Sequence, residues 1–180
     1  MRRTVGAVAL LGVLAAAACT PDPVTPTPPP SPPVSQSPTG TAQERQERLD
    51  YAAAEKSYRT FRAEYNRVLR AGGAKEPTRV MKATAGGDYL AEFMKVAEAY
   101  KGLGSYRTGE ERVVYVRPTG HQPSSVALTV CEDGTALRIY DQASKLVGRG
   151  EIRTAVISVR RTKGAWKVWS GQGKKATSCD

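Results

Sequence analysis

The sequence predicts an α+β domain in which N-terminal helices pack on a curved, mainly antiparallel sheet. Residues 43–71 repeat apolar side chains at helical spacing, and segments rich in β-branched residues begin only after residue 110. Short turn sequences join those later segments. Helices grouped before strands joined by short turns are typical of this class. We expect one such domain over residues 42–180, a length that suits a single core.

Three helices are expected in the first half of the domain. The stripe of the longest one, residues 43–71, has spacings of three and four and comprises Tyr51, Ala54, Tyr58, Phe61, Tyr65 and Val68. A stripe of this kind predicts a buried helix face rather than a ligand wall. Gly72 and Gly73 are expected to end this helix. A short helix is predicted from Pro77, and another over residues 88–101 with Asp88 as its N-cap.

The predicted strands cover residues 111–117, 125–132, 136–141, 151–161 and 165–170. Asp133-Gly134 is a strong hairpin signal and predicts that residues 136–141 return alongside residues 125–132. A second turn is expected at residues 162–164. The sheet should curl over the long helix, because that helix carries the matching apolar face.

Residues 1–18 read as a signal peptide. Arg2 and Arg3 precede an apolar run over residues 5–18, which is shorter than the roughly 20 residues of a membrane-spanning helix. The segment ending at Cys19 resembles a bacterial lipobox, although Ala16 stands where Leu is usual. The resemblance implies that Cys19 is diacylated and anchors an exported protein to the outer face of the cell membrane. The alternative is an ordinary signal peptide cleaved after one of the alanines.

The cysteine count fits this interpretation. The chain has three cysteines, and lipidation of Cys19 leaves Cys131 and Cys179 as one pair. Outside the cytoplasm we expect them to form a disulfide. The loop between them is long enough to contribute about 4 kcal/mol in the chain-entropy model. The alternative is two free thiols.

Residues 19–41 are predicted to form a stalk behind the lipid. Nine of the twelve prolines of the chain lie there, and proline prevents helix and sheet while favouring polyproline II. The segment would act as a spacer that lifts the domain from the membrane. The alternative is low-complexity sequence without a selected role.

Groups suited to catalysis are scarce. His121 is the only histidine and is expected in an exposed loop at residues 118–123. The carboxylates that could serve in a pocket are Asp88, Glu92, Glu98, Asp133 and Asp141. No metal-ligand set, phosphate loop or dinucleotide motif is recognised. The sequence therefore predicts no catalytic residue, no metal and no cofactor.

Basic residues outnumber acidic ones. The chain has 27 Lys and Arg against 17 Asp and Glu, and the excess is still eight without Arg2 and Arg3. The cations expected to contact anionic lipid or wall polymers are Arg153, Arg160, Arg161, Lys163, Lys167, Lys174 and Lys175. The alternative is a solvated sheet edge that charge protects from aggregation. Nucleic acid is not expected as a partner, because no binding module for it is present.

Several segments together resemble a known superfamily. They are residues 87–90 (GDYL), residues 126–133 (VALTVCED), Tyr140-Asp141, Trp166 and Cys179. With the order of helices and strands, they resemble the nuclear transport factor two-like superfamily, and the resemblance implies a cone-like domain. More narrowly, the chain is similar to small secreted lipoproteins of high-GC Gram-positive bacteria that carry this fold.

That superfamily contains ketosteroid isomerases, cyclases and dehydratases, and also many non-catalytic domains, so the resemblance implies a fold rather than one function. The leading hypothesis is a membrane-tethered, extracytoplasmic, non-catalytic domain that binds a partner protein or an apolar small molecule. The first alternative is an isomerase-like or cyclase-like enzyme that uses a pocket carboxylate, Asp88 or Asp141, with Tyr89, Tyr106 or Tyr140. The second is an envelope component of a secretion or conjugation apparatus.

Overall fold

The computed structural model describes residues 40–180, and the predicted signal peptide, Cys19 and nearly all of the predicted stalk lie outside them. Three helices come first: α1 (Ala42–Arg70), α2 (Arg79–Thr84) and α3 (Gly87–Leu103). The strands that follow are β1 (Tyr106–Thr108), β2 (Arg112–Gln122), β3 (Ser125–Asp133), β4 (Arg138–Tyr140), β5 (Leu146–Arg149), β6 (Ile152–Thr162) and β7 (Ala165–Lys175). They form two antiparallel sheets, with strand orders β2-β3-β6-β7 and β1-β4-β5. The predicted α+β class is confirmed.

The long helix α1 begins and ends where local sequence requires it. Thr41 and Glu44 form a capping box, in which Glu44 N donates to Thr41 Oγ1 (3.1 Å) and Thr41 N donates to Glu44 Oε2 (2.6 Å). Beyond the other end, Gly72 and Gly73 adopt φ values of 85° and 82°. A Cβ on Gly73 would lie 2.1 Å from the carbonyl oxygen of Ala97. Only glycine therefore allows the chain to pass this close to α3.

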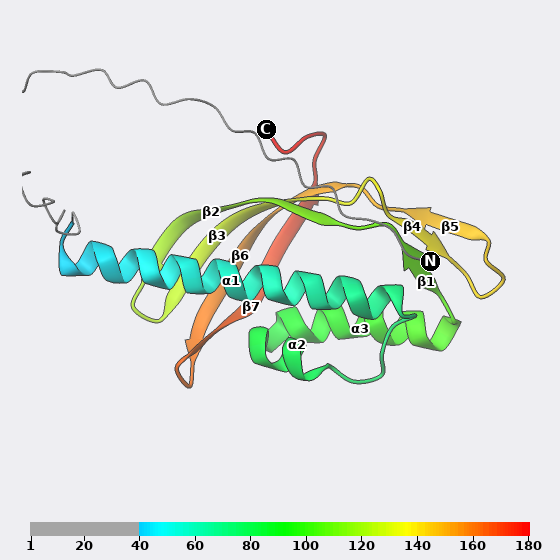
Figure 1. Cartoon of the computed structure of the whole chain (residues 1–180), viewed down its shortest axis with the longest axis horizontal. Helices are drawn as coiled ribbons and strands as arrows, with labels where there is room; N and C mark the ends of the chain where they lie inside the picture. Colours follow the sequence, from blue (N-terminus) through cyan, green and yellow to red (C-terminus); the bar gives the residue numbers. More distant parts are fainter. Residues whose placement is uncertain (1–39) are drawn as a thin grey trace, which may run out of the picture. The chain divides into compact units, whose positions relative to one another are not determined.

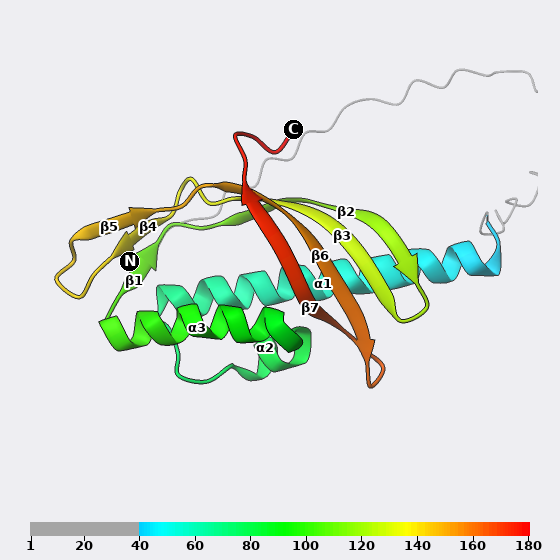
Figure 2. The same cartoon turned by 180° about the vertical axis from the view of Figure 1, so that it is seen from behind.

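The four-stranded sheet curves over α1 and α3, and the core lies between the helices and the inner face of the sheet (Figures 1 and 2). The predicted stripe of α1 is part of this core, where Tyr58 and Phe61 are fully buried. They meet the alternate inward residues of the central strands, among them Leu128 of β3 and Val159 of β6. The stripe is therefore a packing face, as its periodicity predicts.

The shorter helices begin later or earlier than predicted. α2 begins at Arg79 and not at Pro77, because Thr78 is its N-cap and Thr78 Oγ1 accepts a hydrogen bond from Met81 N (3.2 Å). α3 has Gly86 as its N-cap, so the prediction that Asp88 caps this helix is wrong. The Trp169 ring packs so closely on Gly86 that a Cβ there would lie 2.8 Å from it, which excludes the usual capping side chains. Asp88 lies instead in the first turn of α3.

The predicted hairpin at Asp133-Gly134 is wrong. β3 pairs with β2 and β6, whereas β4 pairs with β1 and β5 in the smaller sheet. Asp133 Oδ1 accepts hydrogen bonds from Thr135 N (2.9 Å) and Thr135 Oγ1 (2.6 Å), which closes a local turn. Gly134 N then donates to the carbonyl of Glu151 (3.1 Å), so the chain leaves the larger sheet at this point.

β2 continues through the segment that was predicted to be a loop. It extends to Gln122, past Pro118, with a register shift between Pro118 and Gly120. Proline is tolerated there because β2 is an edge strand of its sheet. The prediction of an exposed loop around His121 is therefore wrong, since His121 lies on the strand and pairs with Val126 of β3.

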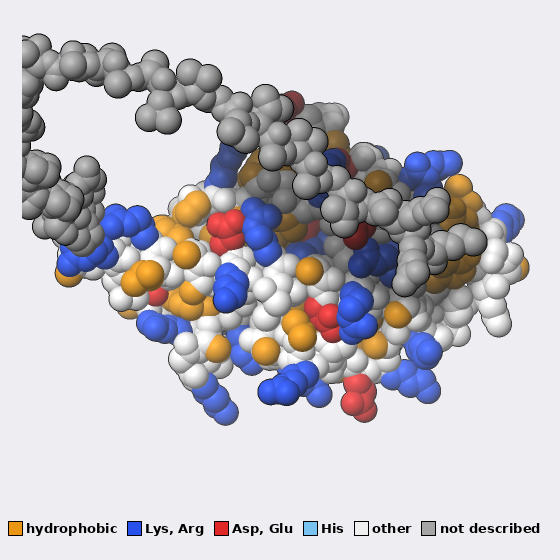
Figure 3. Space-filling view, viewed as in Figure 1, with side chains coloured by type: hydrophobic (Ala, Val, Ile, Leu, Met, Phe, Trp, Pro, Cys, Tyr) orange, Lys and Arg blue, Asp and Glu red, His pale blue; other side chains and the backbone are white. Residues whose placement is uncertain are grey.

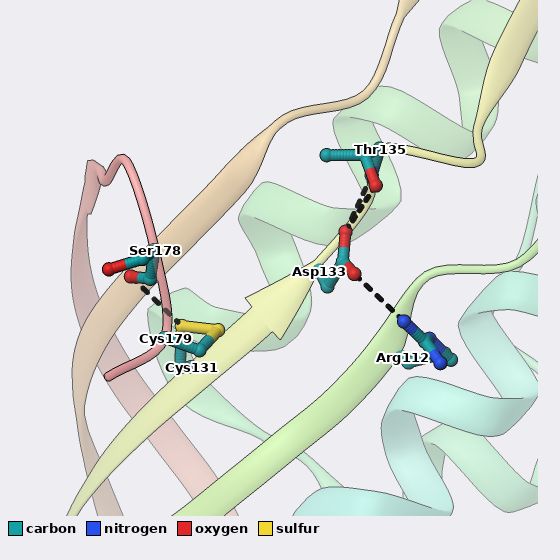
Figure 4. Close-up of a disulfide and its surroundings, with 6 residues drawn as sticks. All are labelled: Arg112, Cys131, Asp133, Thr135, Ser178 and Cys179. Atoms are coloured by element: carbon teal, nitrogen blue, oxygen red, sulfur yellow. Dashed lines mark hydrogen bonds and ion pairs between the residues drawn. A yellow bond between two sulfur atoms is a disulfide. The ribbon is translucent and has the colours of Figure 1, made fainter.

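The predicted disulfide between Cys131 and Cys179 is present in the structure, with the two Cα atoms 5.7 Å apart (Figure 4). It ties the end of the chain to the central strand β3. None of the described helices is long and apolar enough to cross a membrane.

Candidate functional site

The interior beneath the sheet contains a charged network. Arg62 of α1 is 5% exposed, and Glu132 of β3 is 8% exposed. Arg62 Nη2 lies 2.5 Å from Glu111 Oε2, just before β2, and 3.1 Å from Glu132 Oε2. Tyr58 donates a hydrogen bond to Glu132 Oε1 (2.7 Å). A buried charge is costly unless it is paired, and here one guanidinium serves two carboxylates.

A second arginine completes the cluster. Arg107 of β1 is 6% exposed and donates to the side-chain oxygen of Asn66, while Asn66 Nδ2 donates to the carbonyl of Glu111 (3.0 Å). The Arg107 guanidinium lies 5.5 Å from the centre of the Tyr65 ring. Arg107 Nε is buried and lacks a hydrogen-bond partner in the described part of the chain. With Arg62, Glu111 and Glu132, Arg107 gives an interior of two positive and two negative side chains.

Burial and pairing shift the pKa values of this network. Burial alone lowers the pKa of Arg62, but Glu132 and Glu111 outweigh it and raise that pKa above its ordinary value. Burial raises the pKa of Glu132, and Arg62 opposes that shift. Burial also raises the pKa of Tyr58, and of Tyr89 beside it, above the ordinary range. Arg62 therefore stays charged, and both phenols stay protonated at neutral pH.

Three hollows lie on the surface around this core. A hollow of about 450 Å³ opens between α3 and the strands β6 and β7, and its apolar lining includes Tyr89, Phe93 and Ile157. A second, of about 420 Å³, lies over β3, β6 and β7. A third, of about 260 Å³, reaches Arg62 and Glu111 from the side of α1. Glu132 lines none of these three hollows.

The carboxylates predicted to serve a pocket are not brought together. Asp88, Glu92 and Glu98 are exposed along α3, although the first two line the hollow between α3 and the strands β6 and β7. Asp133 accepts hydrogen bonds from Thr135 and pairs with Arg112 (2.9 Å), which lowers its pKa to about 2 (Figure 4). Asp141 accepts from Lys145 N (2.9 Å) within a turn.

The buried carboxylates Glu111 and Glu132 were missed. One signal could have found Glu132, because it shares the alternation of Val126, Leu128 and Val130 on the inward face of β3. A similar signal marks Arg62, which lies four residues after Tyr58 and therefore next to the predicted apolar stripe of α1. Glu111 precedes β2 directly, and no local pattern marks it.

His121 is paired with a buried carboxylate. His121 Nε2 lies 3.0 Å from Asp50 Oδ2, and the two side chains are 19% and 5% exposed. Burial raises the pKa of Asp50, but hydrogen bonds with His121 and Gln46 and the charge of Arg161 lower it overall. In the described chain His121 hydrogen bonds to no hydroxyl or thiol, so the pair lacks a nucleophile. Its contact instead joins the end of β2 to α1.

The structure divides the predicted cations into two groups. At the C-terminal end, Arg153 and Lys175 contact Glu151 at 3.2 and 3.1 Å, and Lys174 lies beside them on β7. At the opposite end, the β6–β7 hairpin carries Arg160, Arg161, Lys163 and Lys167. None of these four forms an ion pair within the described residues. Lys and Arg side chains project widely from the face seen in Figure 3. No group of His, Cys, Asp and Glu in residues 40–180 is suited to hold a metal ion.

Comparisons with known proteins concern the fold alone. No family model and no curated protein matches the chain. The intermembrane space region of the chloroplast protein ARC6 is 16% identical, with a TM-score of 0.51, over 70% of this chain and 97% of that one. A putative dehydratase of the NTF2-like family from Streptomyces avermitilis is 14% identical, with a TM-score of 0.43, over 73% and 99%. A ketosteroid isomerase-like protein from Erwinia carotovora atroseptica is 12% identical, with a TM-score of 0.42, over 72% and 98%.

Proposed function

We propose that the chain is a membrane-tethered, extracytoplasmic binding protein whose folded domain is not an enzyme and meets a partner protein through its surface. One observation carries the non-catalytic part of this proposal: the network of Arg62, Glu111 and Glu132 occupies the interior of the cone. A base in such a fold would have to be free to accept a proton from a ligand beside it. Here the buried carboxylates are held by the guanidinium and by Tyr58.

The apolar part of the interior is filled as well. Phe61, Met81 and Leu128 are each fully buried, and the aromatic rings of α1 and α3 pack edge to face, with the Phe61 and Phe93 centres 5.2 Å apart. An apolar small molecule placed within this core would have to displace these side chains, whereas the three hollows, one of them with an apolar lining, open at the surface. A partner that contacts the surface requires no such rearrangement, so a protein partner is favoured over a buried ligand.

Two features support a position outside the cytoplasm. The disulfide between Cys131 and Cys179 is of a kind that persists in oxidising compartments. Residues 1–19 have the composition of a lipoprotein signal that ends at Cys19. Together with the proline-rich residues 19–41, they favour a domain held at the membrane by a lipid on Cys19.

A second candidate function is an isomerase-like or cyclase-like enzyme, and one observation favours it. Glu132 is a buried carboxyl group with a raised pKa, and Tyr58 donates a hydrogen bond to it. A carboxylate and a phenol side by side are the pieces that proton abstraction requires. This candidate would use Glu132 and Tyr58 in place of Asp88 or Asp141, and it would need a path to Glu132 to open beneath the sheet.

Labelling with an alkyne fatty acid tests the tether. In the host, the full-length chain is expected to incorporate the label and to yield an N-terminal peptide that begins at lipid-bearing Cys19. The Cys19→Ala variant is expected to incorporate none. The matched control is Cys131→Ala combined with Cys179→Ala, which removes the other two cysteines and should keep the label. An unlabelled mature chain that begins at another residue would show that the tether does not exist.

A further inference from the structure

The β6–β7 hairpin concentrates positive charge at one end of the domain. Arg160, Arg161 and Lys163 are exposed, and Lys167 is half-buried. Lys167 Nζ donates to the carbonyl oxygen of Lys82 (2.7 Å), which places exposed Lys82 of α2 beside the hairpin. Lys82, like the hairpin cations, forms no ion pair with any residue in 40–180. We call these five residues the hairpin cluster.

Packing holds the cluster in position. The guanidinium of Arg160 lies 5.7 Å from the ring centre of Trp169, and that of Arg161 lies 5.7 Å from the ring centre of Trp166. Trp166 is buried in the core, and Trp169 rests on the start of α3. Each of these arginines therefore has an aromatic ring within reach, which restricts its side chain before an anion binds.

The tip of the hairpin has an unusual backbone for its residue type. Lys163 has a φ of 51° and Gly164 a φ of 82°, as in the two-residue turns that favour Asn or Gly at both positions. A Cβ on Gly164 would have no atom within 4 Å, so the tip projects into open space. Lysine carries a Cβ and is therefore less suited to a positive φ than Asn or Gly. Outliers of this kind are more common at functional positions.

No described residue forms an ion pair with the cluster, although exposed Asp88 follows Gly87, on which the Trp169 ring packs. The neighbouring β2–β3 hairpin has the uncharged residues Gln122, Pro123, Ser124 and Ser125 at its tip, and Arg161 N donates to the Ser124 carbonyl (2.8 Å). Asp50, whose charge acts on Arg161, is buried and hydrogen-bonded to His121. Both hairpins turn at the end of the sheet that covers the N-terminal half of α1, and the β6–β7 tip points away from that helix (Figures 1 and 2).

We propose that the hairpin cluster docks on the phosphate-bearing headgroups of an anionic membrane. Cations on a projecting tip attract such a surface when they come within a Debye length of it, about 8 Å at physiological salt. A membrane is favoured over a soluble polymer because the predicted lipid at Cys19 would tether the domain to one, and the predicted stalk over residues 19–41 would allow the hairpin to reach its surface. The inference goes beyond the proposed function, since it gives the domain an orientation that does not depend on its partner.

Vesicle binding tests the docking surface. The protein is the unit Thr39–Asp180, which contains the whole core and both disulfide cysteines. It is expected to bind phosphatidylcholine vesicles that contain phosphatidylglycerol and not to bind vesicles of phosphatidylcholine alone. The bound protein should dissociate as the NaCl concentration is raised. Arg160→Gln combined with Lys163→Gln should weaken binding roughly 30-fold, since each cation near an anionic surface contributes about a fivefold factor.

The matched control removes the same charge elsewhere. Lys174 and Lys175 lie at the opposite end of β7. The variant that combines Lys174→Gln with Lys175→Gln is expected to change vesicle affinity less than about threefold. Thermal unfolding verifies that both double variants are folded. Equal losses in the two variants would mean that net charge alone acts, and would overturn the proposal. The proposal would also be overturned if the domain did not bind vesicles at low salt, or if it bound a soluble polyphosphate instead of the vesicles. None of these failures would affect fatty-acid labelling of Cys19.

Discussion

Replacing Arg62 by Leu is expected to destabilise the folded domain by about 3–5 kcal/mol. The change removes the only guanidinium that pairs with Glu111 and Glu132 in the described residues, and it leaves two carboxylates in a buried interior. Protonation of Glu132 would relieve part of this cost. Urea unfolding at neutral pH, followed by circular dichroism, measures the loss.

The matched control for Arg62 is Arg59→Leu, less than one helical turn earlier. Arg59 pairs with Glu55 at 2.7 Å, and both side chains are about 40% exposed. Such a pair contributes about 0.2–1 kcal/mol. Adding Glu132→Gln to Arg62→Leu should recover part of the lost stability, because it removes one unpaired charge. Similar small losses for Arg59→Leu and Arg62→Leu would show that water reaches the interior network.

Removing the disulfide is expected to cost about 4 kcal/mol, because it closes a loop of 48 residues. The test compares the urea midpoints of the oxidised chain, the reduced chain and the variant with Cys131→Ala and Cys179→Ala. The reduced chain and the variant should unfold at similar, lower urea concentrations. Ser178→Ala, beside the bridge, is the control and should change stability by less than about 0.5 kcal/mol. If reduction left the midpoint unchanged, the bridge would not constrain the unfolded chain.

The fold class could be predicted because it depends on local signals. The stripe that includes Tyr58 and Phe61 reports a buried helix face, and Gly72-Gly73 marks the end of that helix through its positive φ values. The errors arose where distant segments decide the structure. Asp133-Gly134 has the chemistry of a tight turn, but its partner Glu151 is 17 residues away in sequence from Gly134. Local propensity cannot show which distant residue accepts such a hydrogen bond.

The site was harder to predict for the same reason. Alternation along β3 places Glu132 inward, but only the fold shows that Arg62 meets it and that Glu111 joins them. His121 lies among Pro and Gly residues that suggest a loop, and its partner Asp50 is 71 residues away. The cations could be counted in the sequence. Their division into a group beside Glu151 and a hairpin cluster required the strand register.

Native mass spectrometry of the unit Thr39–Asp180, recovered from host envelope extract under gentle conditions, tests the central claim most directly. Because the interior is filled and its charges are paired, the spectrum is expected to show the bare domain or the domain with a partner protein. A small-molecule mass that recurs in each preparation and disappears in the Glu132→Gln variant would contradict this account. It would show that the cone opens to a ligand and that Glu132 serves a pocket.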